Sequence, residues 1–562
     1  MARTVAIGIQ SFDDIIENNY FYIDKTKFIR EWWDGGDSVT LITRPRRFGK
    51  TLNISMLECF FSIKYAGRGN LFEGLSIWEE EKYRQLQGTY PVINLSFANV
   101  KETNYDDTRK KICSILTEPF IDNAFLLESN ILEEKDKEFF RTVSMDMDNS
   151  SATLSLHYLS KYLYLYYGKK VIILLDEYDT PMQEAYINGF WEEMVSFTRS
   201  LFNSTFKTNP WLERAVMTGI TRVSKESIFS DLNNLEVVTT TCDKYETTFG
   251  FTEDEVFHAL DEFEMPDKKD EVKEWYDGFI FGKVSDIYNP WSILNYLDKK
   301  KLGIYWANTS SNSLVGKLIR EGSPDVKVVM EGLLLGNAFH TVIDEQIVFN
   351  QLDYLDSAVW SLLLASGYLK AETYQMNLEN DQEEYDLVLT NREVRVMFKR
   401  MINGWFARSA SDYNTFIKAL LFGDLDAMNE YMNRVTSDTF SYFDTGKRPS
   451  GRVEPERFYH GFVLGLMVDL ADRYTLTSNR ESGFGRYDIM LEPRKKEDDE
   501  FILEFKVFNP RRDKNLEDAA VAALQQIEDK KYASVLEAKG FASDKIRKYG
   551  FAFEGKNVWI SG

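Results

Sequence analysis

The sequence predicts an α/β protein with a doubly wound parallel sheet in its N-terminal part and a second, smaller α/β unit at its C-terminus. Residues 170–175 form a continuous apolar run, which is typical of a strand that is buried on both faces. Shorter apolar runs at 38–43, 91–97 and 213–218 alternate with helical patterns. This alternation indicates parallel strands joined by helices.

The strand signal fades after about residue 245, and residues 250–450 have mainly helical patterns. Residues 446–455 are rich in Pro, Gly and charge and predict a linker. The elements expected after it are a helix at 456–473, strands at 486–491 and 501–507, and a helix at 515–530. We therefore expect an α/β core at 1–245, a helical lid or winged-helix-like region at 246–345, a helical linker domain at 346–450, and the C-terminal unit at 451–562.

Composition excludes several classes of protein. The chain has 562 residues and a net charge of −22, which repels nucleic acid at long range, but residues 480–562 carry 16 Lys/Arg and 16 Asp/Glu. Cys59, Cys113 and Cys242 show no C-x-x-C spacing, so a disulfide framework or zinc site is not expected. The chain has no signal-peptide-like start and no apolar run of membrane-spanning length, so we expect a cytoplasmic protein without membrane contact.

A phosphate-binding loop is predicted at residues 44–51, between the strand at 38–43 and a helix beginning near Lys50. Gly49, Lys50 and Thr51 match the end of the G-x-x-x-x-G-K-[ST] pattern, whose backbone N–H groups, lysine and hydroxyl bind phosphates and Mg²⁺. Arg44 replaces the first glycine. The residues expected to contact nucleotide here are Arg44, Pro45, Arg46, Arg47, Phe48, Gly49, Lys50 and Thr51.

Two carboxylates end the apolar strand at 170–175. Asp176 is expected to hold Mg²⁺ together with Thr51, and Glu177 to orient or deprotonate the attacking water. A Gly-Lys-Thr tripeptide or an Asp-Glu pair is common by chance. The two motifs in this order, each after a strand, favour a nucleotide site.

Other polar residues near this site have two interpretations each. Thr218 ends the next strand, where it is expected either to sense the γ-phosphate or to cap the strand. Arg222 follows, either as a group that stabilises transition-state charge or as a surface arginine. Arg46 and Arg47 are expected to touch phosphate, or to face nucleic acid or another copy of the chain, which leaves a homo-oligomer open. Asp179 is expected to pair with a nearby arginine.

A second carboxylate cluster is predicted at the C-terminal strand pair. Because side chains alternate along a strand, Glu504 and Lys506 share one face, and a hairpin would bring Asp488 close to them. Two carboxylates and a lysine suit metal-dependent phosphodiester hydrolysis. On spacing alone, a solvent-facing hairpin with cross-strand ion pairs is favoured about two to one.

The sequence resembles a bacterial and archaeal family that joins an AAA-like ATPase domain to a C-terminal PD-(D/E)XK nuclease-like domain. The segments that carry the resemblance are 22–26, 44–51, 175–179, 218–222, 225–229, 275–278, 288–291, 459–461, 478–483, 485–488, 504–506 and 523–527. The arginine at position 44 is normal for that family. The implied folds are an AAA-like doubly wound sheet and a restriction-endonuclease-like domain.

The resemblance implies roles for the C-terminal residues and reverses the preference for a solvent-facing hairpin. Asp488 and Glu504 match metal ligands, and Lys506 completes the nuclease core. Gln525, or its neighbour Gln526, matches a helix glutamine near such sites. The pattern does not choose between Glu456 and Glu481 as a further acidic ligand.

The leading hypothesis is an ATP-binding and ATP-hydrolysing protein that controls a nuclease. The implied cofactors are ATP and Mg²⁺, with Mn²⁺ as an alternative at the nuclease site. The implied partner of the C-terminal domain is DNA or RNA, and host defence is one role that such a protein could serve. An alternative is a nucleotide-dependent signalling switch whose C-terminal domain binds nucleic acid or protein without cleavage. A non-enzymatic scaffold is disfavoured by the two acidic sites.

Overall fold

The structure is a computed structural model. It describes residues 3–221, 228–229, 232–307, 315–316, 318–319, 324–343, 352, 356–377, 382–406, 410–439, 463, 467, 470, 473–478, 481–482, 485–486, 488–495 and 498–562. The chain divides into two compact units. The first unit contains Met1–Leu314 and His340–Arg395, and the second contains Val315–Phe339 and Val396–Gly562.

The core of the first unit is a five-stranded parallel sheet with the order β2-β3-β4-β1-β5. Its strands are β1 (Val39–Thr43), β2 (Val92–Ser96), β3 (Val171–Asp176), β4 (Leu212–Gly219) and β5 (Leu235–Val238). The first four confirm the strands predicted from apolar runs, and the doubly wound α/β class is confirmed. The fifth strand, β5, was not predicted.

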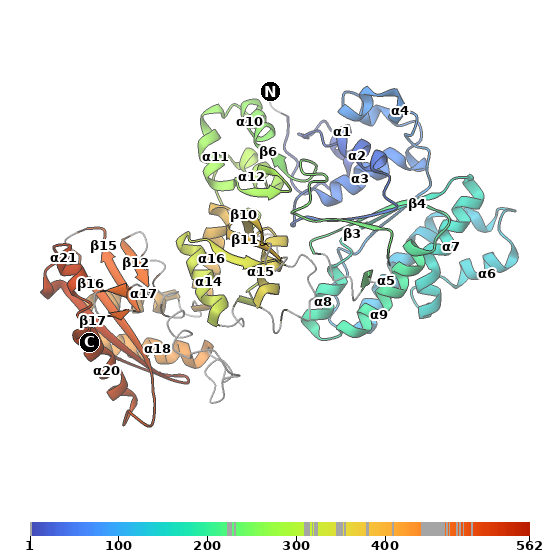
Figure 1. The fold of residues 1–562 in the computed structure, drawn as a ribbon. Helices are drawn as coiled ribbons and strands as arrows, with labels where there is room; N and C mark the ends of the chain where they lie inside the picture. The colour runs from blue at the N-terminus through green and yellow to red at the C-terminus, as the bar shows by residue number, and fades with distance from the viewer. Residues whose placement is uncertain are drawn as a thin grey trace. The chain divides into compact units, whose positions relative to one another are not determined.

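Helices cover both faces of this sheet (Figure 1). On one face lies α3 (Lys50–Phe61), which leads from β1 to β2, and on the other lie α5 (Tyr105–Asp122), α7 (Asn149–Tyr167) and α9 (Trp191–Phe202). The strand order reverses direction between these connections, so right-handed crossovers place them on opposite faces. Every residue of β1 and β3 is therefore buried.

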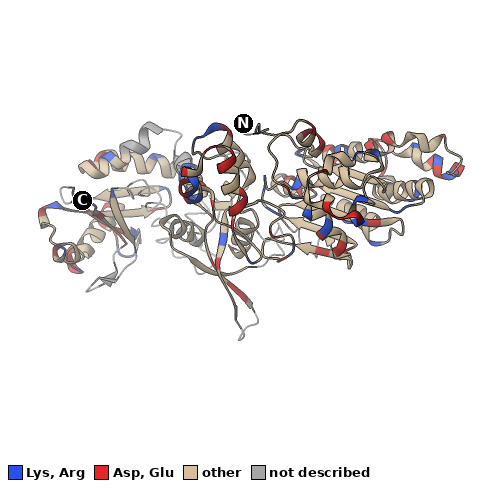
Figure 2. Cartoon of the chain, turned by 90° about the horizontal axis from the view of Figure 1, so that it is seen from above, with Lys and Arg blue, Asp and Glu red and all other residues tan. Residues whose placement is uncertain are grey.

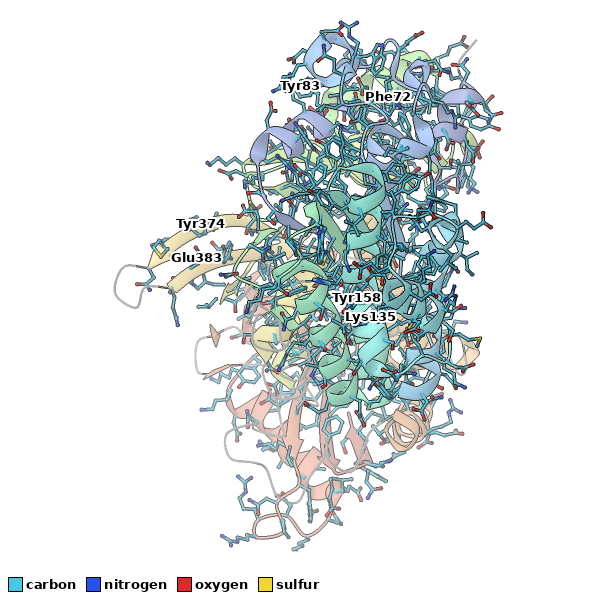
Figure 3. All side chains as sticks on the ribbon, turned by 90° about the vertical axis from the view of Figure 1, so that its right-hand side faces the viewer. Phe72, Tyr83, Lys135, Tyr158, Tyr374 and Glu383 are labelled. Carbon is cyan, nitrogen blue, oxygen red and sulfur yellow. The ribbon has the colours of Figure 1, made fainter. Side chains whose placement is uncertain are left out.

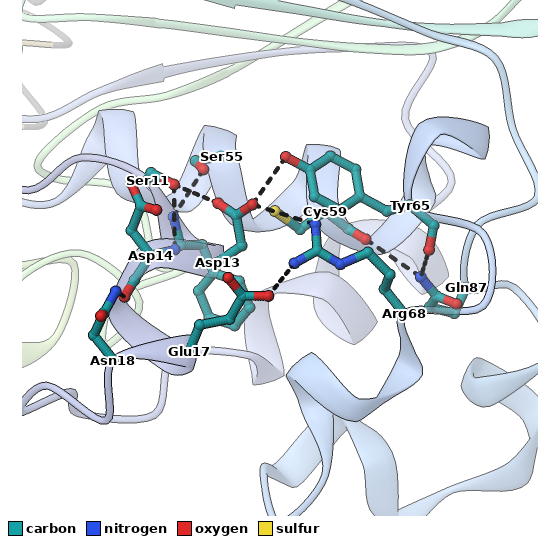
Figure 4. Close-up of polar contacts among 11 residues, drawn as sticks. Ser11, Asp13, Asp14, Glu17, Asn18, Ser55, Cys59, Tyr65, Arg68 and Gln87 are labelled. Carbon is teal, nitrogen blue, oxygen red and sulfur yellow. Dashed lines mark hydrogen bonds and ion pairs between the residues drawn. The ribbon is translucent and has the colours of Figure 1, made fainter.

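The N-terminal helix α1 (Phe12–Glu17) is fixed to α3 by polar contacts (Figure 4). The Ser11 hydroxyl accepts a hydrogen bond from the Asp14 amide at 3.3 Å and caps α1. The Ser55 hydroxyl on α3 accepts one from the Phe12 amide at 2.9 Å. The Ser55 hydrogen bond holds α1 against the helix that begins at the phosphate-binding loop.

Residues 251–307 combine helices with a small sheet of order β6-β8-β7. The elements are β6 (Phe251–Thr252), α10 (Glu253–Glu262), α11 (Lys269–Tyr276), β7 (Phe279–Phe281), β8 (Val284–Tyr288) and α12 (Pro290–Lys299). The expectation of a mainly helical region missed these strands, because each has only two to five residues. Strands this short give little alternation for a pattern to detect.

Residues 346–450 were expected to be helical, which α15 (Asp356–Ala365) confirms, but the expectation is wrong for the stretch between α15 and α16. There β10 (Leu369–Asn377) and β11 (Gln382–Leu389) form an antiparallel hairpin, and β9 (Phe339–Val342) pairs with β11. Figure 3 shows Tyr374 and Glu383 on this hairpin, and Figure 2 shows its acidic residues. Helices follow as predicted: α16 (Arg392–Phe406), α17 (Ala410–Phe422) and α18 (Leu425–Thr439).

The C-terminal part of the second unit is a five-stranded mixed sheet with the order β12-β15-β16-β17-β18. Its elements are β12 (Tyr474–Ser478), β15 (Ile489–Pro493), β16 (Glu500–Val507), α20 (Leu516–Asp529), β17 (Ile546–Glu554) and β18 (Asn557–Ser561). Helix α18 packs on β18, where the Asn429 and Asn433 side chains donate to the Ile560 and Val558 carbonyls.

The predicted linker at 446–455 lies outside the described residues, as does most of the predicted helix at 456–473. The predicted hairpin and the helix at 515–530 are confirmed, although the first strand begins at Ile489 rather than at residue 486. Of the helices in the described ranges, none combines the length and apolar character needed to span a membrane.

Candidate nucleotide and nuclease sites

The polar residues predicted for the nucleotide site meet at one edge of the parallel sheet. Parallel strands β1, β3 and β4 end at the same edge, which brings Thr51, Asp176 and Thr218 together. The Thr51 hydroxyl donates to Asp176 Oδ2 at 2.6 Å, and the Thr218 hydroxyl donates to Asp176 Oδ1. Thr218 thus holds the carboxylate that was predicted to bind magnesium.

Two charged side chains, Asp176 and Lys50, are buried at this edge of the sheet. Asp176 is 2% exposed, and burial raises the pKa of its carboxyl, while the two threonine hydroxyls oppose that shift. Lys50 is 4% exposed, and burial lowers the pKa of its ammonium group. A hydroxyl and a carboxylate at 2.6 Å are oxygen ligands of the kind that Mg²⁺ prefers, so these residues fit that ion.

The loop backbone has the shape of an anion-binding nest. Arg47 and Gly49 have positive φ values of 65° and 80°, and alternation of right- and left-handed conformations turns successive N–H groups inward. The Lys50 ammonium donates to the carbonyls of Arg44 and Pro45, both at 2.9 Å. The lysine thereby braces the loop from within.

The Arg44 side chain was expected to contact nucleotide, and the structure directs it elsewhere. Arg44 is fully buried, and its guanidinium donates to the carbonyls of Thr43 at 3.0 Å and Lys244 at 3.3 Å. The guanidinium also lies 4.6 Å from the centre of the Phe281 ring. Arg44 therefore ties the end of β1 to the segment after β5, and only its backbone belongs to the loop.

Three further loop residues, Arg46, Arg47 and Phe48, also contact protein. The Arg46 guanidinium donates to Gln183 Oε1 at 3.1 Å, and the Arg47 guanidinium stacks on Trp291 at 4.3 Å from the ring centre. Phe48 is 1% exposed and packs on Phe279, with ring centres 4.7 Å apart. These contacts do not connect Arg46 or Arg47 to Thr51, Asp176 or Thr218.

Glu177 lies directly after β3 at the same edge and has a positive φ of 50°, which is a strained conformation for a glutamate. Its amide donates to the Thr218 hydroxyl at 3.4 Å, and its carboxylate accepts from the Thr180 hydroxyl at 3.2 Å. Positive φ for a non-glycine residue next to a magnesium-type ligand is typical of functional sites. Arg222 lies outside the described residues.

Asp179 was expected to pair with an arginine, but its direct partners are different. It is 1% exposed and accepts from the backbone amides of Ile220 at 2.9 Å and Thr221 at 3.0 Å. Gln183 donates to Asp179 at 3.1 Å and accepts from Arg46, so the arginine is linked only through an amide. Gln183 was not identified from the sequence, and no motif marked it.

The second candidate site lies on the hairpin of β15 and β16. Ile489 pairs with Leu503 in an antiparallel register, so Asp488 lies opposite Glu504. Asp488 Oδ2 accepts a hydrogen bond from the Phe505 amide at 2.8 Å. The face that carries Glu504 is not solvent-facing: Ile502 on it packs against Ile527 of α20. Glu504 is accordingly only 3% exposed.

Helix α20 supplies a glutamine to this cluster, and it is Gln526. Its Nε2 donates to Glu504 Oε1, while its Oε1 accepts from the Lys506 ammonium at 2.9 Å. Gln525, named first in the prediction, is exposed and donates to Asp529. Helical periodicity could have chosen correctly, because Gln526 follows Ala523 by three residues on the buried face.

The chemistry of this donor set fits a hard divalent cation. Burial raises the pKa of Asp488 to about 6, and the nearby Lys506 opposes the shift. Two carboxylates in a partly desolvated site gain from a bound cation that replaces lost hydration. Glu456 lies outside the described residues, and the side chain of Glu481 is also outside them.

The first unit contains a further acidic cluster that was not predicted from the sequence. Glu253, Asp277 and Asp286 approach one another, and burial together with Asp286 raises the pKa of Asp277 to about 7. Lys273 contacts all three carboxylates, at 3.8 Å from Asp277 and 3.3 Å from Asp286. The protein's own ammonium group therefore balances this cluster.

Comparisons with known proteins match a family model to each of the two parts of the chain that carry these residues. Residues 6–229 match the family model described as predicted AAA-ATPase, and residues 454–562 match the PD-(D/E)XK nuclease superfamily. A protein of Azotobacter chroococcum mcd 1, described as an uncharacterized protein in the vnfD 5' region, is 26% identical over 577 residues. The match covers 98% of this chain and 99% of that protein. The chain joins an AAA-ATPase-like domain to a PD-(D/E)XK nuclease superfamily domain, as predicted.

Proposed function

We propose that this protein binds and hydrolyses ATP and that the state of its ATPase domain controls a Mg²⁺-dependent nuclease, which cleaves phosphodiester bonds of DNA or RNA. The observation that carries the nuclease assignment is the cluster of Asp488, Glu504, Lys506 and Gln526, in which Glu504 is 3% exposed and α20 supplies the Gln526 side chain. A solvent-facing hairpin would expose these charges. Burying the Glu504 carboxylate and half-burying the Asp488 carboxylate costs stability, and an active site is the usual reason for that cost.

In the ATPase domain, each residue has a separate task. The backbone N–H groups of the loop and the Lys50 ammonium bind the β- and γ-phosphates. Thr51 and Asp176 would hold Mg²⁺, with Thr218 orienting the Asp176 carboxylate. Glu177 accepts the proton of the attacking water as the water oxygen bonds to the γ-phosphorus; the bond from the γ-phosphorus to the β–γ bridging oxygen breaks, which releases ADP and phosphate.

In the nuclease domain, Asp488 and Glu504 would hold the divalent cation. When bound at either site, Mg²⁺ lowers the pKa of coordinated water and neutralises charge on the phosphate. Lys506 places a positive charge next to the carboxylates, where it stabilises negative charge that develops on the phosphodiester. Gln526 holds Glu504 and Lys506 in a fixed relation through two hydrogen bonds.

The test is a cleavage assay on the full chain. Plasmid, single-stranded DNA and RNA are each incubated with Mg²⁺ or Mn²⁺, with and without ATP. The double variant Asp488→Ala/Glu504→Ala removes both carboxylates, and Glu177→Gln removes the proposed base. We expect the double variant to lose cleavage and retain ATP turnover. We expect Glu177→Gln to lose turnover and to alter the effect of ATP on cleavage.

Three results would contradict the proposal. Cleavage that persists in the double variant would show that a contaminant or another site cuts the substrate. Wild-type protein that binds nucleic acid but cleaves none of the three substrates would favour the signalling switch. ATP turnover that is unchanged in Glu177→Gln would exclude Glu177 as the base.

A further inference from the structure

The carbonyl groups at the start of the phosphate-binding loop are all held by hydrogen bonds. Lys50 holds the carbonyls of Arg44 and Pro45 from within the loop. The third carbonyl, that of Arg46, is held from outside the ATPase sheet. The loop therefore depends on a segment that follows the sheet in the chain.

Two side chains bind the Arg46 carbonyl. Trp306 Nε1 donates to it at 2.9 Å, and Asn289 Nδ2 donates at 3.3 Å. A trans peptide group is planar, and its C=O and N–H point in opposite directions. Fixing the Arg46 carbonyl therefore fixes the direction of the Arg47 N–H. Arg47 has the left-handed conformation that turns loop N–H groups toward an anion.

The position of Trp306 is itself fixed by packing. The indole is 3% exposed and lies 5.5 Å from the Phe279 ring and 5.3 Å from the Tyr368 ring, centre to centre. Phe279 in turn contacts Phe48 of the loop. The indole cannot turn away from the loop without displacing this aromatic cluster.

Glu393 holds the backbone on which Trp306 lies. Its Oε1 accepts from the amides of Tyr305 at 2.6 Å, Trp306 at 2.7 Å and Ala307 at 3.4 Å. Its Oε2 accepts from the Ser292 hydroxyl at 2.7 Å. The residue is 1% exposed, and burial raises the pKa of its carboxyl while these hydrogen bonds oppose the shift. A buried carboxylate with this many donors is a rigid anchor.

Glu393 is also the second residue of α16, which Asn391 caps by accepting from the Val394 amide at 3.0 Å. Glu393 belongs to the first unit, whereas Val396 and the following residues of the same helix belong to the second unit.

We infer that Trp306 and Glu393 are positioning residues of the nucleotide site and that Glu393 links the phosphate-binding loop to α16. Trp306 orients the Arg46–Arg47 peptide group for phosphate, and Glu393 keeps Trp306 in place. Nucleotide binding at the loop then changes the constraint on the first turn of α16. This inference rests on the proposed binding of ATP, and it names α16 as the element through which bound nucleotide acts.

The test compares three variants of the full chain with the wild type. Trp306→Phe keeps an aromatic ring but removes the indole N–H and part of the ring volume, and Glu393→Gln removes the charge of the anchor. Trp78→Phe is the matched control, since Trp78 packs on Phe72. Affinity for a fluorescent ATP analogue with Mg²⁺, kcat and KM for ATP, and hydrogen–deuterium exchange of α16 with and without nucleotide are measured. Thermal unfolding without nucleotide verifies the fold.

We expect Trp306→Phe to weaken nucleotide binding by about three- to tenfold, the effect of one net hydrogen bond. Its kcat should change less than its KM, because the indole acts on phosphate binding. Glu393→Gln should weaken binding as well and should abolish the nucleotide-dependent change in α16 exchange. If Glu393→Gln does not fold, Ser292→Ala replaces it, since this variant removes one bond to Glu393 and leaves the three backbone amides.

Wild-type affinity in Trp306→Phe would overturn the positioning role. A nucleotide-dependent change in α16 that survives in folded Glu393→Gln, or that is not reduced in Ser292→Ala when that variant replaces it, would overturn the link to that helix. Failure of the wild type to bind the analogue at all would refute the proposed ATPase function itself, and the wild-type arm separates that outcome from the other two.

Discussion

Replacing Asp488 with Asn should stabilise the metal-free C-terminal domain at neutral pH, because the structure places this carboxylate where ionisation is costly. Burial raises its pKa from 3.8 to about 6. Two pKa units correspond to about 3 kcal/mol of unfolding free energy. Asn keeps an oxygen that can accept from the Phe505 amide, so the change removes mainly the charge.

The pH dependence gives this prediction a definite sign. The folded domain binds the Asp488 proton more tightly than the unfolded chain does, so wild-type stability falls as pH rises from about 4 to about 6. The Asn variant has no such proton. Its advantage should be roughly 1 kcal/mol at pH 4.5 and about 3 kcal/mol at pH 8.

The measurement is hydrogen–deuterium exchange of peptides from β15 to β17 in EDTA, at both pH values, corrected for intrinsic exchange rates. Asp544→Asn, which alters an exposed carboxylate of the same domain, is the control and should change stability little. Adding Mg²⁺ should stabilise the wild type more than Asp488→Asn, because only the wild type keeps both ligands. Equal stability of wild type and variant at pH 8, or an advantage that does not vary with pH, would refute the reasoning.

Three further predictions concern single residues. Glu177→Gln should lower kcat for ATP by about a hundredfold or more while leaving ATP affinity within about threefold, measured by turnover and equilibrium binding; a large loss of affinity would mean that Glu177 shapes the loop. Arg44→Met should lower the free energy of unfolding by roughly 3 kcal/mol, measured by thermal unfolding, because it leaves several buried carbonyls without donors. Normal stability together with weakened ATP binding would instead indicate that the Arg44 side chain contacts the nucleotide. Gln526→Ala should reduce divalent-cation affinity and cleavage about tenfold, whereas Gln525→Ala should have no effect; the reverse order would contradict the placement of these two side chains.

Local patterns in the sequence were sufficient to predict the parallel sheet. A strand buried on both faces has to be apolar throughout, so β3 was visible as an uninterrupted run, and its carboxylates had to lie at the sheet edge with the loop after β1. The hairpin of β15 and β16 was visible for a related reason, since alternation placed Glu504 and Lys506 on one face.

The apolar patterns did not reveal strands that are very short or largely exposed. The strands β6 and β7 are too short for a periodic signal, and the β10–β11 hairpin has an exposed, acidic outer part with little apolar alternation. The helical prediction missed these strands because exposed strands are stabilised by their pairing partners, whereas the helices of the region were predicted correctly.

The sequence by itself determined which residues are chemically capable of binding phosphate and metal, because those capabilities belong to residue type and to position at a strand end. Only the tertiary structure decided which of them face the sites. In the tertiary structure Arg44 is buried in the core, α20 packs against the face of β16 that carries Glu504, and Gln526 rather than Gln525 contacts Glu504. Each of these outcomes depends on a neighbour that is distant in the chain, and the burial that such a neighbour imposes sets both the direction of a side chain and the cost of its charge.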